Sequence, residues 1–371
     1  MADSSSGNKQ SNDKPFVVMA LQGGGAMGAF QVGAYQALSE KGYEPDWVAG
    51  ISIGAINASI IAGNPQKDRL KRLNEFWSTV AGHLDWWDFV PSYSEKFANL
   101  WKIWLSLVGG VPGFFRPHYI PPPFVPLGSP QACSLYSVHQ LRKTLESLID
   151  FRILNDYDSP THVWLSLGVT NVTEGAPKTF ESFGGKAVQI TVDHVMASGA
   201  VVPSFPGVVV DGGLCWDGGV TSNTCVRHLL DHLNRIAEDK HVLVFAINLW
   251  SHDDREPKSF EEVCWRLKQI YFSSRLRSEM DHGKTFLDCE RLKEQATSGG
   301  TAAKGKRHID FVCISYPSDP NEIPLGDLLF SRTAIERRIR KGHSTMLEQL
   351  EKDPCPCDLH GKDEWVSTHY C

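Results

Sequence analysis

The sequence lacks an excess of positive charge, which a nucleic-acid-binding surface would need. Its 37 Lys and Arg residues are outnumbered by 43 Asp and Glu residues, which gives a net charge of −6. We therefore expect no nucleic-acid partner. Residues 1–14 also lack the basic start and apolar stretch of a secretory signal, so they are expected to form a disordered tail of a cytoplasmic protein.

A regular framework of cysteines is missing as well. The nine cysteines are odd in number and unevenly spaced, so we expect thiols rather than disulfides. The segment 353–371 contains further potential metal ligands, namely Cys355, Cys357, His360, His369 and Cys371. Their spacing matches no standard zinc site. The sequence thus predicts neither a metal nor another cofactor.

Long apolar runs are absent too. In the segment 84–127, which is rich in aromatic residues and prolines, the most apolar part covers residues 103–115. That is shorter than the roughly twenty residues needed to span a bilayer. The segment therefore fits either a lid that also touches a membrane surface peripherally or an ordinary insertion packed on the domain.

What the sequence does contain is an alternation of short apolar strands and amphipathic helices, which is typical of an α/β fold layered around one mostly parallel sheet. Strands are expected at 16–21, 46–51, 162–171, 178–183, 241–249 and 308–316. Helices are expected at 29–41, 53–63, 136–149, 191–199, 223–237, 259–280 and 331–352. The first two strands should pair in parallel, each followed by a helix.

The pentapeptide GISIG joins the second strand to its helix. It has the G-x-S-x-G pattern of a nucleophile elbow, with Ser52 on a tight turn between Gly50 and Gly54. Glycines at these positions avoid side-chain clashes where backbone segments crowd together. We therefore predict that Ser52 is a catalytic nucleophile.

A glycine-rich loop, LQGGGAMG, joins the first strand to its helix. Gly23, Gly25 and Gly28 formally match a dinucleotide-binding fingerprint, but Asp46 precedes the second strand instead of ending it. The amides of this loop, Gly24 included, are better placed to stabilise an oxyanion beside Ser52. The loop is accordingly predicted to form an oxyanion hole.

The base that takes the serine proton has more than one candidate. His194 follows the strands in a glycine- and serine-rich context, although a capping role explains this histidine better. Asp211 and Asp217 each precede two glycines, and a carboxylate on such a turn can act directly as a base. From these residues alone the choice stays open.

These motifs together resemble the patatin-like phospholipase family: GGGAMG resembles its oxyanion loop, GISIG its elbow, and ASGAVVPSFPGVVVDGGLCWDGGVTSN its D-G-G block. The resemblance implies a three-layer α/β/α fold over 15–230 and a Ser/Asp dyad in which Asp217 is the base. Residues 231–352 would then be an extension that completes the domain. Met27 and Cys225 depart from the Arg and Pro usual in the family.

The sequence therefore predicts a serine hydrolase acting on lipid acyl esters, of the phospholipase A or lysophospholipase type. The alternatives are a non-catalytic protein that binds lipids or acyl chains on the same fold and, further away, a nucleotide-binding protein. The oligomeric state stays open.

Overall fold

A computed structural model describes seven stretches of the chain: residues 14–81, 95–236, 241–251, 256–297, 309–317, 323–352 and 366–370. Most of the predicted tail 1–14, residues 84–94 of the predicted insertion and most of the segment 353–371 lie outside the described residues. Within the described part, every helix is too short or too polar to serve as a membrane span.

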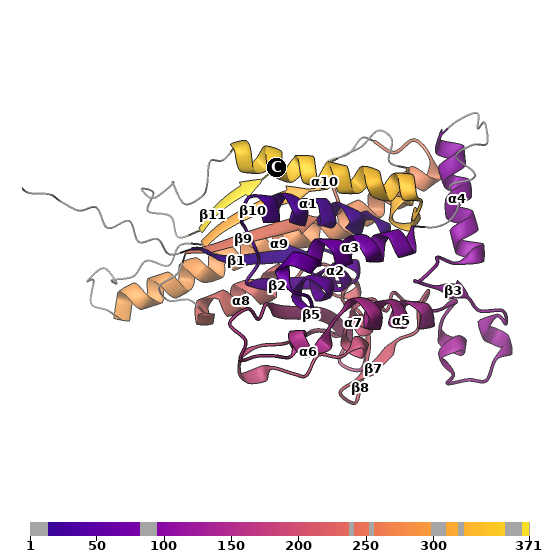
Figure 1. The fold of residues 1–371 in the computed structure, drawn as a ribbon, viewed down its shortest axis with the longest axis horizontal. Helices are drawn as coiled ribbons and strands as arrows, with labels where there is room; N and C mark the ends of the chain where they lie inside the picture. The colour runs from indigo at the N-terminus through magenta and orange to yellow at the C-terminus, as the bar shows by residue number, and fades with distance from the viewer. Residues whose placement is uncertain are drawn as a thin grey trace, which may run out of the picture.

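One nine-stranded sheet forms the centre of the described structure, in the order β11-β10-β9-β1-β2-β5-β8-β7, with β6 paired to β5 (Figure 1). Six strands run parallel: β1 (Phe16–Leu21), β2 (Trp47–Ile51), β5 (Trp164–Asn171), β9 (Val242–Asn248), β10 (Ile309–Ser315) and β11 (Val366–Tyr370). Three run antiparallel to their neighbours: β6 (Ala176–Glu181), β7 (Val208–Val210) and β8 (Gly213–Asp217). A separate small ribbon pairs β3 (Arg116–Pro117) with β4 (Tyr136–Ser137).

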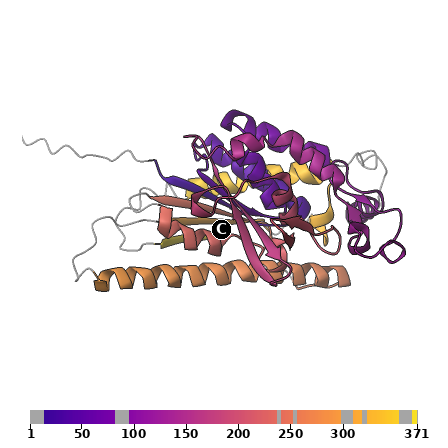
Figure 2. The same cartoon turned by 90° about the horizontal axis from the view of Figure 1, so that it is seen from below.

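Helices cover both faces of this sheet (Figure 2). One face packs against α1 (Ala29–Glu40), α2 (Ile53–Ala62), α3 (Gln66–Val80), α5 (His139–Leu148), α7 (Val192–Ser198) and α10 (Arg332–Lys352), with the short α6 (Phe151–Leu154) beside them. The other face packs against α8 (Val226–Ile236) and the long α9 (Phe260–Thr297). Helix α4 (Glu95–Gly109) lies at one end of the molecule.

The alternation of side chains along the strands explains the two cores. In β1, Val17 and Met19 belong to the larger core, whereas Val18 and Ala20 belong to the core under α8 and α9. Successive residues of a strand point to opposite faces, so a strand covered on both sides must be apolar throughout. The predicted three-layer α/β/α fold with a mostly parallel sheet is therefore confirmed.

The structure also contains elements that were not predicted from the sequence, among them α3, α4 and the β7–β8 hairpin. This hairpin turns at Asp211 and Gly212, whose φ angles are 49° and 76°. An Asp-Gly pair with positive φ at both positions is typical of a two-residue hairpin turn. The first D-G-G is thus a turn between two strands.

Candidate active site

Ser52 occupies the sharp turn between β2 and α2. Its φ of 57° and ψ of −125° lie outside the ordinary regions for a residue with a side chain. A Cβ added to Gly50 would lie 2.3 Å from the Gly54 carbonyl oxygen, and one added to Gly54 would lie 2.2 Å from the Leu21 carbonyl oxygen. Both glycines are therefore required by the crowding of β1, β2 and α2 around Ser52.

Asp217 ends β8 and lies beside this turn, with its side chain buried. Its Oδ1 accepts a 2.7 Å hydrogen bond from the Gly219 amide, while its buried Oδ2 has no hydrogen bond of standard geometry among the described residues. Burial raises the pKa of Asp217 to about 6, and the nearby Ser52 hydroxyl and the Gly219 amide oppose that rise. The carboxylate is thus a stronger base than an exposed aspartate and faces a serine hydroxyl.

The segment 197–200, which precedes the β7–β8 hairpin, accepts hydrogen bonds from the backbone amides of both Ser52 and Asp217. The Ser198 hydroxyl accepts a 3.1 Å hydrogen bond from the Ser52 amide and donates a 2.6 Å bond to the Gly168 carbonyl. Two residues later, the Ala200 carbonyl accepts a 2.9 Å bond from the Asp217 amide. The A-S-G-A motif therefore fixes the elbow and the carboxylate to one short piece of backbone.

The glycine loop passes over the elbow between β1 and α1. A Cβ added to Gly23 would lie 3.0 Å from the Ser52 Cβ, and Gly25 has a φ of +55° that favours glycine. Gly24 and Gly25 stand at the start of a 3₁₀ turn, η1 (Gly25–Gly28), where amides have no partner within the turn. Gly28, at the other end, packs against Ile53 and is not among the residues that line the cavity described below.

Two side chains hold the Gly23 carbonyl. It accepts a 2.9 Å hydrogen bond from Asn223 Nδ2 and a 2.8 Å bond from Trp250 Nε1. In a trans peptide the carbonyl and the following N–H point in opposite directions, so these bonds also orient the Gly24 amide. Sequence reasoning missed the role of Trp250 because nothing near it in the chain resembles a site motif.

A cavity of about 440 Å³ opens beside Ser52. Its polar lining includes the glycine loop, Ser52, Asp217 and Asn223. Asp327 adds a second carboxylate, whose Oδ2 forms a 2.8 Å ion pair with Lys268 Nζ. The rest of the wall is mainly apolar. It includes residues from well outside the region with motifs: Leu107, Phe114, Phe115, Tyr136, Trp250, Tyr271, Phe272, Leu328 and Phe330.

His194 and Asp211, the other candidate bases, lie elsewhere and do not line this cavity. His194 caps α7: its Nδ1 accepts a 3.1 Å hydrogen bond from the Thr191 amide, and burial lowers the pKa of the imidazole. Its Nε2 lies 3.6 Å from Asp211 Oδ2 in the hairpin turn. The structure therefore brings Ser52 together with Asp217, and His194 together with Asp211.

The two departures from the family pattern are both buried. Met27 belongs to the larger core, beside α1 and α2, and Cys225 belongs to the core under α8. Burial also raises the pKa of the Cys225 thiol. Both residues therefore serve packing in this chain.

A serine on a strained strand-to-helix turn, next to a largely apolar cavity, is the arrangement typical of serine hydrolases that accept acyl chains. Within that class, the chain belongs to the patatin-like phospholipase family, whose family model matches residues 19–230.

Curated relatives are lysophospholipases of fungi. Lysophospholipase NTE1 of Kluyveromyces lactis is 26% identical over 252 residues, covering 66% of this chain and 13% of the relative. Lysophospholipase nte1 of Aspergillus terreus is 24% identical over 252 residues, covering 66% of this chain and 12% of the relative. The chain thus spans about an eighth of the length of the curated relatives it matches.

Among solved structures, VipD from Legionella pneumophila matches with 16% identity and a TM-score of 0.38, over 92% of this chain and 67% of that one. The type III effector protein ExoU matches with 15% identity and a TM-score of 0.36, over 92% of this chain and 53% of that one.

Proposed function

We propose that the protein hydrolyses acyl esters of lipids, with Ser52 as nucleophile and Asp217 as base. What supports these roles is one observation: the strained Ser52 faces the buried carboxylate of Asp217 at the polar end of an otherwise apolar cavity. Among the described residues no histidine lines this cavity. Of its two carboxylates, Asp217 interacts with the Ser52 hydroxyl, whereas Asp327 is paired with Lys268.

The first half of the reaction forms an acyl-enzyme. Ser52 Oγ attacks the ester carbonyl carbon while Asp217 accepts the hydroxyl proton. The negative oxygen that develops is stabilised by the amides of Gly24 and Gly25, and the Gly24 amide is oriented through the hydrogen bonds to the Gly23 carbonyl. The carbon–oxygen bond of the ester then breaks, and the leaving alcohol takes the proton from Asp217.

The second half releases the fatty acid. Asp217 removes a proton from water, the hydroxyl oxygen attacks the acyl carbon, and the proton returns to Ser52 as its oxygen leaves. The N-terminus of α2 begins directly after Ser52 and adds its positive end to the same site. The apolar wall holds the acyl chain during both halves.

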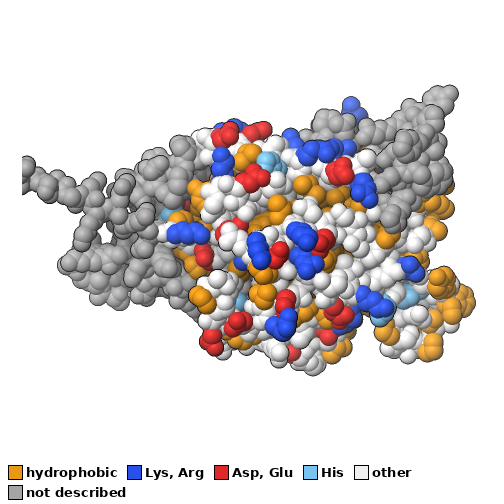
Figure 3. Space-filling model, viewed as in Figure 1, with side chains coloured by type: hydrophobic (Ala, Val, Ile, Leu, Met, Phe, Trp, Pro, Cys, Tyr) orange, Lys and Arg blue, Asp and Glu red, His pale blue; other side chains and the backbone are white. Residues whose placement is uncertain are grey.

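A lipid surface is the natural source of such a substrate, and two helices are suited to contact it. Four exposed apolar residues of α4 recur at helical spacing on one face: Phe97, Trp101, Trp104 and Val108. A similar exposed set lies on the first part of α9: Phe260, Val263, Leu267 and Ile270. Orange side chains gather at the end of the molecule where α4 lies (Figure 3). Leu107 of α4 and Tyr271 of α9 also line the cavity. We therefore propose that the exposed apolar residues of both helices contact the lipid surface.

The test of the chemistry is active-site labelling. A fluorophosphonate should label the full-length protein, and Ser52→Ala should abolish labelling while the matched surface change Ser147→Ala leaves it intact. Lysophospholipids should be assayed first, beside diacyl phospholipids and neutral glycerides, because the curated relatives are lysophospholipases. A well-folded wild type without labelling or turnover would favour a non-catalytic lipid-binding protein.

The test of the surface is binding to phospholipid vesicles. Val108→Asp on α4 should weaken co-sedimentation, whereas Val209→Asp, at a similarly exposed valine of β7, should not. Equal effects of the two changes would contradict a specific contact through α4.

A further inference from the structure

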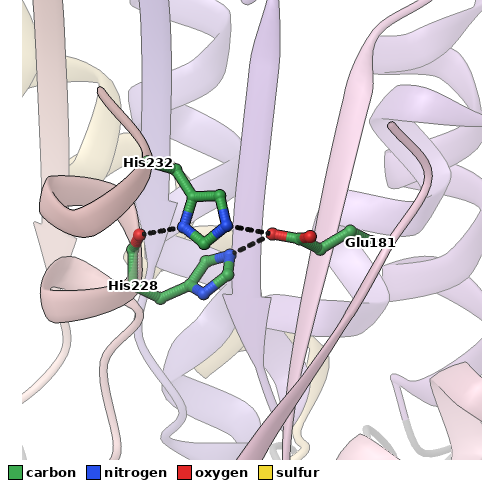
Figure 4. A group of neighbouring side chains, drawn as sticks. All are labelled: Glu181, His228 and His232. Atoms are coloured by element: carbon green, nitrogen blue, oxygen red, sulfur yellow. Dashed lines mark hydrogen bonds and ion pairs between the residues drawn. The ribbon is translucent and has the colours of Figure 1, made fainter. Parts of the chain in front are cut away.

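Three potential metal ligands meet on the face of the sheet that α8 covers (Figure 4). Glu181 ends β6, and His228 and His232 lie one turn apart on α8. His228 Nε2 lies 2.7 Å and His232 Nε2 3.2 Å from the same oxygen, Glu181 Oε1. The side chain of Glu181 is 7% exposed, and those of the histidines are 18% and 21% exposed.

Neighbouring groups determine which ring nitrogens are available. His232 Nδ1 lies 3.0 Å from the His228 carbonyl oxygen, which can only accept, so Nδ1 carries the hydrogen. When the ring is neutral, its Nε2 therefore presents a lone pair toward Glu181. A hydrogen bond from the other ring nitrogen to a backbone carbonyl is the usual way in which proteins prepare a histidine for metal binding.

Hydrogen bonding leaves one atom of this group unsatisfied. Glu181 Oε1 is buried and has no hydrogen bond of standard geometry among the described residues, although two imidazoles converge on it. A buried carboxylate oxygen and the Nε2 atoms of two imidazoles thus converge in a poorly solvated place, where a cation would stabilise them.

We propose that Glu181, His228 and His232 bind a divalent transition-metal ion, Zn²⁺ in preference to Fe²⁺. The three ligand atoms lie within 4.8 Å of one another. In a tetrahedral zinc site with bonds of about 2.0–2.1 Å, ligand atoms lie about 3.3 Å apart, so small side-chain shifts suffice. At the same ligands Zn²⁺ binds more tightly than Fe²⁺. A water molecule that enters beside the partly exposed histidines would supply the fourth ligand.

The position of this metal site points to a structural role. Ser166, which pairs with Glu181 in the sheet, accepts a 3.0 Å hydrogen bond from Trp47 at the start of β2, whereas Ser52 follows the end of that strand. Five residues of a strand span roughly 16 Å, so the proposed metal site lies about that far from Ser52. A bound ion would join α8 to β6 and stabilise the fold without touching the reacting atoms.

The experiment measures zinc binding to the full-length protein after removal of metal with a chelator. Cys355, Cys357 and Cys371 are changed to serine in every sample, so that the tail thiols do not compete for the metal. Calorimetric titration should give one Zn²⁺ per chain, and Zn²⁺ should raise the melting temperature. Glu181→Gln and His232→Gln should each weaken binding at least about 100-fold, since even outer-shell changes typically cost 10–100-fold.

The matched control is His343→Gln. His343 lies 2.8 Å from Glu40, so it forms a histidine–carboxylate pair without a second imidazole in that pair, and its loss should leave zinc binding unchanged. Co²⁺ gives a readout that does not depend on variants: the wild type should show the intense visible bands of four-coordinate Co²⁺. No uptake at micromolar Zn²⁺, weak six-coordinate Co²⁺ bands, or equal binding by the Glu181 and His343 variants would overturn the proposal.

Discussion

Two buried carboxylates, Asp217 and Glu181, lie on strands that both pair with β5, and they differ in their neighbours. Asp217 faces a serine hydroxyl and a backbone amide, and its burial raises its pKa to about 6. Glu181 is also buried, but His228 and His232 hold its pKa below the ordinary value. A carboxylate left with neutral donors becomes a better base, whereas one facing imidazoles stays anionic and suits a cation. The chemistry follows from the partners rather than from burial itself.

The largest effect should come from removing the base. Asp217→Asn keeps the shape of the side chain and its acceptor for the Gly219 amide, but it cannot take a proton from Ser52. We expect ester turnover to fall by about 10,000-fold, the size of effect that loss of an aspartate from a serine hydrolase site can produce. The measurement is the steady-state rate on the best lipid substrate.

The same variant should be more stable, which separates lost chemistry from lost folding. Because the pKa of Asp217 is about 6 in the folded protein and 3.8 ordinarily, its ionisation costs the folded state up to about 3 kcal/mol at pH 7. Asp217→Asn should recover part of this free energy of unfolding. The gain should vanish below about pH 4, where both states are protonated; a loss of stability at pH 7 would contradict a strained, buried charge.

The pH dependence of wild-type activity should show the next largest effect. Asp217 must be ionised to act as base, so kcat/KM should be flat above about pH 7 and should fall about tenfold per pH unit well below pH 6. His194→Gln provides the control, because this imidazole also has a pKa below its ordinary value. A low-pH limb that disappears in His194→Gln would restore a histidine mechanism.

A smaller effect is expected at Trp250, which acts through the Gly23 carbonyl. Trp250→Phe keeps most of the ring and removes one 2.8 Å hydrogen bond, while Asn223 keeps the other. The Gly24 amide is then oriented less well, and a loss of about 1 kcal/mol of transition-state stabilisation should lower kcat roughly fivefold with little change in KM. An increase in KM alone would mean that Trp250 only shapes the apolar wall.

The parts of the site whose residues lie close together in the chain could be predicted from the sequence. Gly50, Ser52 and Gly54 fall within five residues, so the crowding that requires them leaves a readable pattern. Asp217 could be chosen over Asp211 only through the family resemblance, because the hairpin turn and the proposed base share the same D-G-G letters. The fold was predictable for the related reason that alternating apolar segments are local patterns.

Contacts between distant segments were not predictable. Trp250 lies 227 residues from the carbonyl that it holds, and Glu181 lies on a strand well before the helix of its two histidines. The spacing of His228 and His232 does place them on one helix face, but no pattern in the sequence identifies Glu181 as the third ligand. Only the pairing of β6 with β5 brings it there.

Glu181→Gln should change activity least, and it tests the contrast between Glu181 and Asp217 from the other side. Because Glu181 lies away from Ser52, kcat and KM should stay within about twofold of wild type in metal-free buffer. Stability should fall instead: a carboxyl whose pKa is lowered by folding stabilises the protein at neutral pH, and that contribution disappears as the pH falls below its ordinary pKa of 4.5. If turnover dropped tenfold in folded Glu181→Gln, the two carboxylates would be coupled through α8, which begins three residues after Asn223. They would then belong to one site, and a metal at Glu181 would regulate hydrolysis as well as stability.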